Sequence, residues 1–156
     1  NLSNCGMHAM DIMRMESGFL HWGHDISPEE NQYQAGLSFT ISNKKGVDFI
    51  GKKALENLKK NKIKSRFAMF TLKESKPGEP LLLHDEPIYH EDKIIGRSTS
   101  GNYSFNFKKN LVFGYIENEF SDEELKSKNL FIEVEKKKYP ILFQSGPLKR
   151  TNFKNL

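Results

Sequence analysis

Apolar residues recur at intervals of three near the start of the chain, at Met7, Met10 and Met13. This spacing places them on one side of a helix, and Gly18 suits the left-handed exit at the helix end. Methionine is flexible and polarizable, so such a stripe can fill a core, which is its commoner use, or line a ligand cavity. The pattern predicts an amphipathic helix that ends near Gly18.

Three more local patterns precede residue 62. Ser27, Pro28 and two glutamates supply the cap, first position and first turn that are typical of a short helical start. Apolar and polar residues alternate over 37–41, which predicts a strand with Phe39 on its apolar face. The apolar residues of 50–58 recur at helical spacing and predict a second amphipathic helix with a basic polar side.

From residue 65 the chain changes to short apolar runs separated by turn residues. The expected strands are 67–72, 81–83, 88–89, 94–99, 111–116, 130–134 and 139–143. Short strands at such intervals, with no long helix between them, favour a small antiparallel barrel or sandwich. The sequence therefore predicts an α+β fold with a boundary at residues 60–66.

Composition adds limits to this picture. The 156 residues suffice for one sizeable domain or two small ones, and the 12 phenylalanines can fill a core. The chain opens at Asn1 on what reads as mid-domain sequence, so we expect a piece of a longer protein. The net charge of +4 comes from scattered lysines, which is typical of solvated surfaces. One cysteine, no signal-peptide pattern and no apolar run of about 20 residues lead us to expect a cytoplasmic protein without a membrane partner.

Candidate chemistry is sparse. His21, His24 and Asp25 are three potential metal ligands, but no second ligand cluster follows at the spacing of known zinc sites, so hydrogen-bonded structural histidines are favoured and no metal is expected. Cys5 and His8 stand three residues apart, yet no third residue is placed to orient the histidine for nucleophilic catalysis. We expect Cys5 to be a buried thiol.

Aromatic and basic residues interleave over 103–109, a pattern that single-strand nucleic-acid binders use for base stacking. The same alternation is typical of a half-buried strand, and no nucleic-acid-binding module accompanies it. We therefore expect no nucleic-acid partner. A non-catalytic β-barrel that binds protein or RNA through its lysines is the alternative from another functional class.

Four motifs in order carry a family resemblance. The chain contains HAMDIMRMESGFLHWGHDIS, then QAGLSF, then DFIGKKAL, then GRSTSGNYSFNFKKNLVFGYIE. In this order and spacing they resemble the C-terminal part of the glycine-cleavage T-protein (aminomethyltransferase) family. The chain looks most like the folate-dependent region of dimethylglycine and sarcosine dehydrogenases, where a helix ends in a pattern similar to R-x-E-K-x-F-x-x-W-G-H-D-I.

The resemblance implies a division of the chain. Residues 1–62 would complete the folate-binding α/β region of the aminomethyltransferase domain, and residues 66–150 would form the family's C-terminal β-barrel. Members bind tetrahydrofolate and use it to take up a one-carbon unit, assisted by an aspartate in an N-terminal portion that this chain does not contain. The resemblance therefore implies no catalytic residue here.

Cofactor-binding residues are implied only where motifs match. Phe39 stands where T-proteins place an aromatic side chain against the aryl group of the folate. Met10 stands where T-proteins have an arginine, a departure that the dehydrogenase-type members share. Trp22 occupies the family's aromatic position before a glycine and would shape the cavity, and Arg150 lies where some relatives place a cation near the glutamate tail of the folate.

Arg14 and Glu16 match the family's R-x-E pattern. They could hold the helix end in place by an ion pair, or Arg14 could face the folate channel; structural ordering is favoured. The second alternative makes Arg14 a candidate cofactor-binding residue.

We expect this chain to be the C-terminal fragment of a tetrahydrofolate-dependent enzyme that handles one-carbon units from N-methylated glycines. Its substrate would be a small methylated amine, and an upstream domain would carry FAD if the protein is a dehydrogenase. The alternative is a glycine-cleavage T-protein, which works with a lipoyl carrier protein, or a related folate-dependent demethylase. The fragment alone is expected to be inactive.

Overall fold

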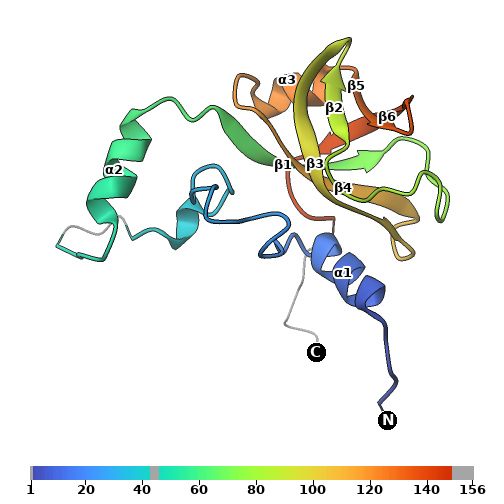
Figure 1. The fold of residues 1–156 in the computed structure, drawn as a ribbon, viewed down its shortest axis with the longest axis horizontal. Helices are drawn as coiled ribbons and strands as arrows, with labels where there is room; N and C mark the ends of the chain where they lie inside the picture. The colour runs from blue at the N-terminus through green and yellow to red at the C-terminus, as the bar shows by residue number, and fades with distance from the viewer. Residues whose placement is uncertain (1, 43–45, 149–156) are drawn as a thin grey trace.

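A computed structural model describes residues 2–42 and 46–148, in which six antiparallel strands form a closed barrel (Figure 1). The strands are β1 (Ser65–Leu72), β2 (Pro87–His90), β3 (Lys93–Ser104), β4 (Lys109–Glu117), β5 (Leu130–Val134) and β6 (Lys137–Gln144). The helices are α1 (Met7–Glu16), the 3₁₀ helix η1 (Ser38–Thr40), α2 (Lys52–Lys60) and α3 (Asp122–Ser127). No helix in the described part of the chain is long and apolar enough to cross a membrane.

The strand order around the barrel is β1-β4-β3-β2-β5-β6, and β6 pairs with β1 to close it. Alternation along each strand sends one set of side chains inward, so Phe70, Ile88 and Ile132 are almost fully buried. Gly96 is required where β3 meets β4, because an added Cβ would lie 2.1 Å from the carbonyl oxygen of Tyr115. The predicted antiparallel barrel following an α-helical segment is confirmed.

Two predicted strands are wrong. Residues 37–41 form η1 and its flanks, because the amide and the hydroxyl of Thr40 both donate to the carbonyl oxygen of Leu37. The closed barrel also offers this segment no free strand edge to join. Residues 81–83 lie in a loop, where Leu82 alone is buried and packs against Gly101, whose absent Cβ would come within 2.3 Å of it.

Two of the three predicted helices are confirmed and the third, expected at Ser27, is wrong. The helix ending before Gly18 is confirmed, with Gly18 at φ 77°, and so is the helix expected within 50–58. Ser27 begins a turn rather than a helix, since its amide and hydroxyl bind Glu30 and the chain does not continue helically. Figure 1 shows α2 set apart from the barrel, and α2 buries none of its residues.

Helix α3 was missed, although Ser121 and Glu124 form the capping-box pattern that announces a helix start. The hydroxyl of Ser121 accepts from the amide of Glu124, whose carboxylate accepts in turn from the amide of Ser121. Leu125 of this short helix is buried in the main core of the barrel. The helix thus covers one end of the barrel, beside β5 and β6 (Figure 1).

We expect Ser121→Ala to raise the pKa of Glu124 toward its ordinary value. Hydrogen bonds from the backbone and side chain of Ser121 hold the pKa of Glu124 below its ordinary value. A carboxyl with a depressed folded-state pKa stabilises the fold above its unfolded pKa, and this contribution is lost as pH falls through the folded pKa. NMR titration of the Glu124 side chain in both proteins measures the change; an unaltered pKa in the variant would contradict the capping box.

Candidate functional site

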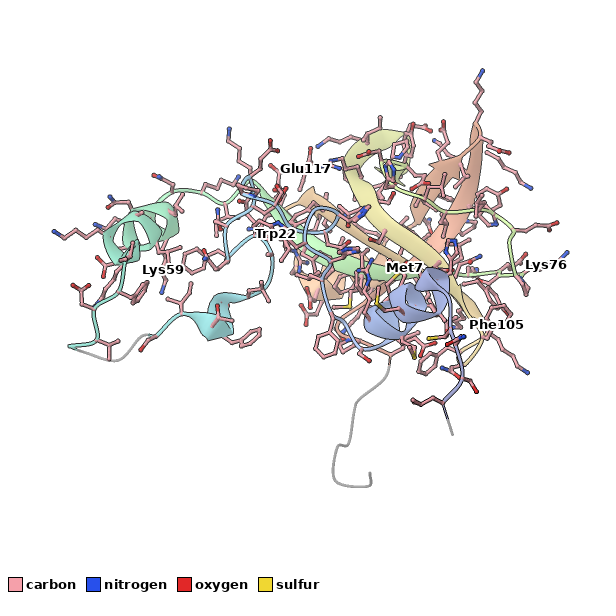
Figure 2. The ribbon with its side chains drawn as sticks, turned by 60° about the horizontal axis from the view of Figure 1, so that its bottom comes forward. Met7, Trp22, Lys59, Lys76, Phe105 and Glu117 are labelled. Atoms are coloured by element: carbon pink, nitrogen blue, oxygen red, sulfur yellow. The ribbon has the colours of Figure 1, made fainter. Side chains whose placement is uncertain are left out.

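A cavity of about 280 Å³ opens where α1, the loop after it, the 81–84 segment and β3 meet. We call it the α1 pocket. It is lined by residues from all four segments: Met7, His8, Met10, Asp11, Arg14, His21, His24, Leu81, Leu82, Leu83, His84, Thr99, Ser100, Gly101 and Asn102. Methionine and leucine side chains make its surface largely apolar, and imidazoles lie around it. In Figure 2, α1 crosses in front of the barrel with Met7 at its end.

Helix α1 is held against the barrel by a small second core. Met15 is buried with Leu111 and Phe113 of β4, and several partly buried apolar residues pack around them. The opposite side of the helix therefore points away from β4, and Met7 and Met10 are left on the pocket. Met15 therefore packs in the core, whereas Met7 and Met10 line the cavity.

The carboxylate of Asp25 ties the loop after α1 to both α1 and β3. It accepts hydrogen bonds from Thr99 Oγ1 at 2.6 Å, Ser100 Oγ at 2.8 Å and the amide of His21 at 2.9 Å, and it forms an ion pair with Arg14 Nη1. The side chain is fully buried. Four donors from three segments thus satisfy one buried negative charge.

A register shift in β3 explains how two consecutive hydroxyls reach the same carboxylate. Neighbouring side chains of a regular strand point to opposite faces. The pairing of β3 with β4 shifts between Ser98 and Ser100, so Thr99 is the extra residue of a β-bulge. The bulge turns Thr99 and Ser100 toward Asp25 together.

Arg14 carries a positive charge that is largely neutralised within the site. Its Nε lies 2.8 Å from Asp11 Oδ1, its Nη2 donates to Ser100 Oγ at 2.8 Å, and its Nη1 contacts Asp25. The guanidinium also lies over the ring of Phe113, with 5.5 Å between its central carbon and the ring centroid. Arg14 is therefore shared between holding the fold and lining the pocket.

Tyr115 of β4 adds a further hydrogen bond between the barrel and the loop after α1. Its hydroxyl donates to the backbone carbonyl of Asp25 at 2.8 Å. Burial, together with the carboxylates of Glu30 and Asp25, raises the pKa of Tyr115 far above its ordinary value. The phenol therefore stays protonated at neutral pH and acts as a hydrogen-bond donor to Asp25.

Glu16 is a second buried carboxylate and anchors the end of α1. It accepts from Ser104 Oγ at 2.5 Å and from Asn106 Nδ2 at 2.9 Å and 3.2 Å. Arg14 and Glu16 thus order the end of the helix, as expected, but each through its own partners on the barrel and not through an ion pair with the other.

The candidate cofactor-binding residues fall in different places. Met10 and Arg14 line the α1 pocket. Trp22 is 65% exposed and lies on the loop after α1, on the side of the barrel that faces α2 (Figure 2). Phe39 is 81% exposed and borders a separate shallow hollow near Lys59. Arg150, like Lys149, lies outside the described residues.

Two expectations about the first helix are corrected. Core filling was the favoured use of the methionine stripe, yet Met7, Met10 and Met13 are all about half exposed or more, because the face that packs on the barrel is the one that carries Met15. Cys5 is exposed, since it precedes the helix and lies off the barrel.

His21 and His24 lie side by side, with ring centroids 4.6 Å apart. The third potential ligand, Asp25, already has both carboxylate oxygens engaged by hydrogen bonds. In residues 2–42 and 46–148 no group of three or more histidine, cysteine, aspartate or glutamate side chains is arranged to hold a metal ion. The loop is therefore organised around the Asp25 carboxylate.

The arrangement is suited to binding. Asp11 lines the α1 pocket and Asp25 binds its lining residues Thr99 and Ser100; both carboxylates are paired with Arg14. Exposed apolar side chains and imidazoles of the lining residues remain to meet a ligand. The sequence did not reveal the contribution of Leu82, Thr99 or Ser100, since these residues approach α1 only through the folding of the barrel.

Comparisons with known proteins agree with this architecture. The model of the glycine cleavage T-protein C-terminal barrel domain matches residues 66–148, and the model of the GCVT N-terminal domain matches residues 1–45. Mitochondrial dimethylglycine dehydrogenase of Homo sapiens is 31% identical over 147 residues, which are 94% of this chain and 16% of that protein. Mitochondrial sarcosine dehydrogenase of Homo sapiens is 31% identical over 115 residues, 74% of this chain and 12% of that protein.

A solved structure shares the fold. The glycine cleavage system aminomethyltransferase T from Bartonella henselae superposes with a TM-score of 0.74 at 24% identity, covering 90% of this chain and 38% of that one. The chain thus spans 16% or less of the two dehydrogenases and 38% of this transferase.

Proposed function

Because the chain belongs to the glycine cleavage T-protein family, we propose that it is the C-terminal part of a tetrahydrofolate-dependent enzyme that handles one-carbon units from N-methylated glycines. In this proposal residues 1–62 complete the folate-binding region and residues 66–150 form the C-terminal barrel. The catalytic carboxylate, and FAD in a dehydrogenase, belong to parts of the enzyme outside this chain.

The α1 pocket is the observation that carries the proposal. It is concave and largely apolar, and it is built jointly by α1 and the barrel, so it depends on both matched regions of the family. Small-molecule sites have this character, with an apolar lining and a few placed polar groups. We propose that Met10 and Arg14 contact the folate there. Roles for Phe39, Trp22 and Arg150 at the cofactor would require the rest of the enzyme to bring the folate to them.

The choice of the dehydrogenase type rests on two further observations. Similarity to dimethylglycine dehydrogenase runs over 94% of the chain. In the family resemblance of the first helix, Met10 stands where T-proteins have an arginine, and the dehydrogenase-type members share this departure. The alternative, a T-protein that works with a lipoyl carrier, is decided by the residues upstream of Asn1, where a dinucleotide-binding glycine motif would indicate a dehydrogenase.

We expect Met10→Trp in the full-length enzyme to weaken tetrahydrofolate binding by about tenfold or more, because the larger indole would occupy part of the α1 pocket, whose volume is about 280 Å³. Isothermal calorimetry under anaerobic conditions measures the affinity. Met13→Trp is the matched control, since Met13 lies on the same helix, is exposed and does not line the pocket.

Two results would count against the proposal. Absence of tetrahydrofolate binding to the unmodified enzyme at high micromolar ligand would refute the assigned function. Equal effects of Met10→Trp and Met13→Trp would instead show that folate binds elsewhere on the enzyme.

A further inference from the structure

We infer that Glu86 is a positioning residue for the ligand of the α1 pocket. Its carboxylate fixes residues 81–83, which we call the leucine segment and which form one wall of that pocket. The inference rests on the proposed function, because it takes tetrahydrofolate as the ligand. Glu86 does not line the pocket itself, so it acts on the ligand only through the leucines whose position it determines.

The leucine segment is held to the barrel by one of its three side chains. Leu82 is buried against Gly101 of β3, where an added Cβ would come within 2.3 Å of it. Leu81 and Leu83, on either side, are 66% and 59% exposed and line the pocket. Apolar contact has no preferred direction, so the packing of Leu82 alone does not fix the backbone around it. The segment therefore needs polar contacts to keep one shape.

The carboxylate of Glu86 supplies these directional contacts. Its Oε1 accepts a hydrogen bond from the amide of Leu83 at 2.7 Å, and its Oε2 accepts one from the hydroxyl of Ser98 on β3. The amide of Glu86 donates to Ser98 Oγ at 3.0 Å, and the amide of Ser98 donates to the carbonyl oxygen of Glu86 at 2.9 Å. Because Ser98 is fully buried, the carboxylate ties the leucine segment to a fixed point of the barrel.

The place of Ser98 on β3 connects this contact to the other side of the pocket. Ser98, Thr99 and Ser100 are three consecutive hydroxyl residues. Thr99 and Ser100 bind the carboxylate of Asp25, which belongs to the loop after α1, whereas Ser98 binds Glu86. Asp25 and Glu86 also each accept from an amide of their own loop. One short stretch of β3 thus fixes two loops that border the α1 pocket.

Removal of the Glu86 carboxylate would deprive the hydroxyl of Ser98 and the amide of Leu83 of this acceptor. A buried polar group that loses its partner carries a desolvation cost, which water relieves only if the loop opens. Leu81 and Leu83 would then move relative to β3, and the wall would fit a ligand held against α1 less well. Ligand binding should weaken, whereas chemistry performed by groups outside this chain should be unaffected.

The test compares the full-length enzyme with its Glu86→Ala and Glu86→Gln variants. Anaerobic calorimetry measures the Kd for tetrahydrofolate, and formation of the one-carbon folate from dimethylglycine measures KM and kcat. We expect Glu86→Ala to raise Kd and the KM for tetrahydrofolate by about tenfold and to leave kcat unchanged. Glu86→Gln should recover most of this loss, because its amide oxygen can accept from Leu83 and its amide nitrogen can donate to Ser98 Oγ.

Glu124→Ala is the matched control. The Glu124 carboxylate also accepts from a backbone amide and a serine hydroxyl, both of Ser121, but Glu124 lies outside the α1 pocket. This variant should leave Kd, KM and kcat unchanged.

Hydrogen–deuterium exchange of residues 81–86 in the ligand-free enzyme gives a readout that needs no folate. Exchange should rise in Glu86→Ala and stay unchanged in Glu124→Ala, because only the first variant releases the leucine segment. If Glu86→Ala does not fold, Ser98→Ala takes its place. Ser98→Ala removes one of the two hydrogen bonds of the carboxylate, so it should show the same changes at a smaller size.

The outcomes separate the two proposals. If the unmodified enzyme binds tetrahydrofolate and Glu86→Ala leaves either the exchange of 81–86 or the KM unchanged, the inference is overturned and the proposed function stands. If Glu86→Gln or Glu124→Ala loses as much affinity as Glu86→Ala, the two hydrogen bonds do not position the wall and the inference is again wrong. If the unmodified enzyme binds no tetrahydrofolate, the proposed function falls and this inference falls with it.

Discussion

Asp25→Ala should lower the free energy of unfolding of this chain by about 3–5 kcal/mol, the cost of removing one partner from a buried ion pair. Arg14 would lose its buried carboxylate, and the hydroxyls of Thr99 and Ser100 would lose a common acceptor. Because the side chain of Asp25 is fully buried, water cannot replace these bonds without opening the contact between the loop and β3. Denaturant unfolding followed by circular dichroism measures the loss.

Asp92→Ala is the matched control for this prediction. Asp92 pairs with Lys138 at 3.1 Å, but its side chain is fully exposed, and exposed pairs contribute only about 0–1 kcal/mol. Similar losses in the two variants would show that Asp25 is not the centre of the connection between α1, its loop and the barrel.

Phe70→Ala should cost about 3–5 kcal/mol for a different reason, the cavity left in the barrel. Phe70 is 1% exposed and lies edge-on to Phe143 on the neighbouring strand, with ring centroids 5.9 Å apart. The strands on either side of Phe70 are held by continuous pairing, so the barrel can close only part of the space. The same unfolding measurement checks it.

Phe105→Ala removes the same atoms from the surface. Phe105 is 73% exposed and contacts Tyr103 at the end of the β3–β4 connection, so its loss should change stability by no more than about 0.5 kcal/mol. A Phe70→Ala variant no less stable than Phe105→Ala would mean that the interior of the barrel is not close-packed.

The barrel was largely predictable, because its strands alternate and its turns carry recognisable residues. The expected strand 130–134 coincides with β5, whose burial alternates along its length. The alternation over 37–41 wrongly predicted a strand. Three apolar residues in five fit a strand only where a partner strand is available, and this segment has none. The order of the motifs indicated the family more securely than any element, and the family match confirms it.

The site was predictable only in part. Its local half was visible, as Met10 and Arg14 fall on one helix and line one pocket. The other half depends on long-range contacts: Thr99 and Ser100 are 74 and 75 residues from Asp25, and a bulge whose position the sequence does not announce brings them together. Asp25 was therefore considered as a metal ligand, although its role is to receive hydrogen bonds.

The bonds of Asp25 have a consequence for exchanging parts between related enzymes. Asp25 lies in the region matched by the N-terminal domain model, whereas Thr99, Ser100 and Tyr115 lie in the barrel matched by the other. A chimera joined between residues 45 and 66 would take the Asp25 carboxylate and its two hydroxyl donors, Thr99 and Ser100, from different parents, even though the join falls between the two matched regions. We expect chimeras in this family to fold when α1 and its loop are exchanged together with the barrel. The segment that can be exchanged as one unit is therefore larger than the barrel itself.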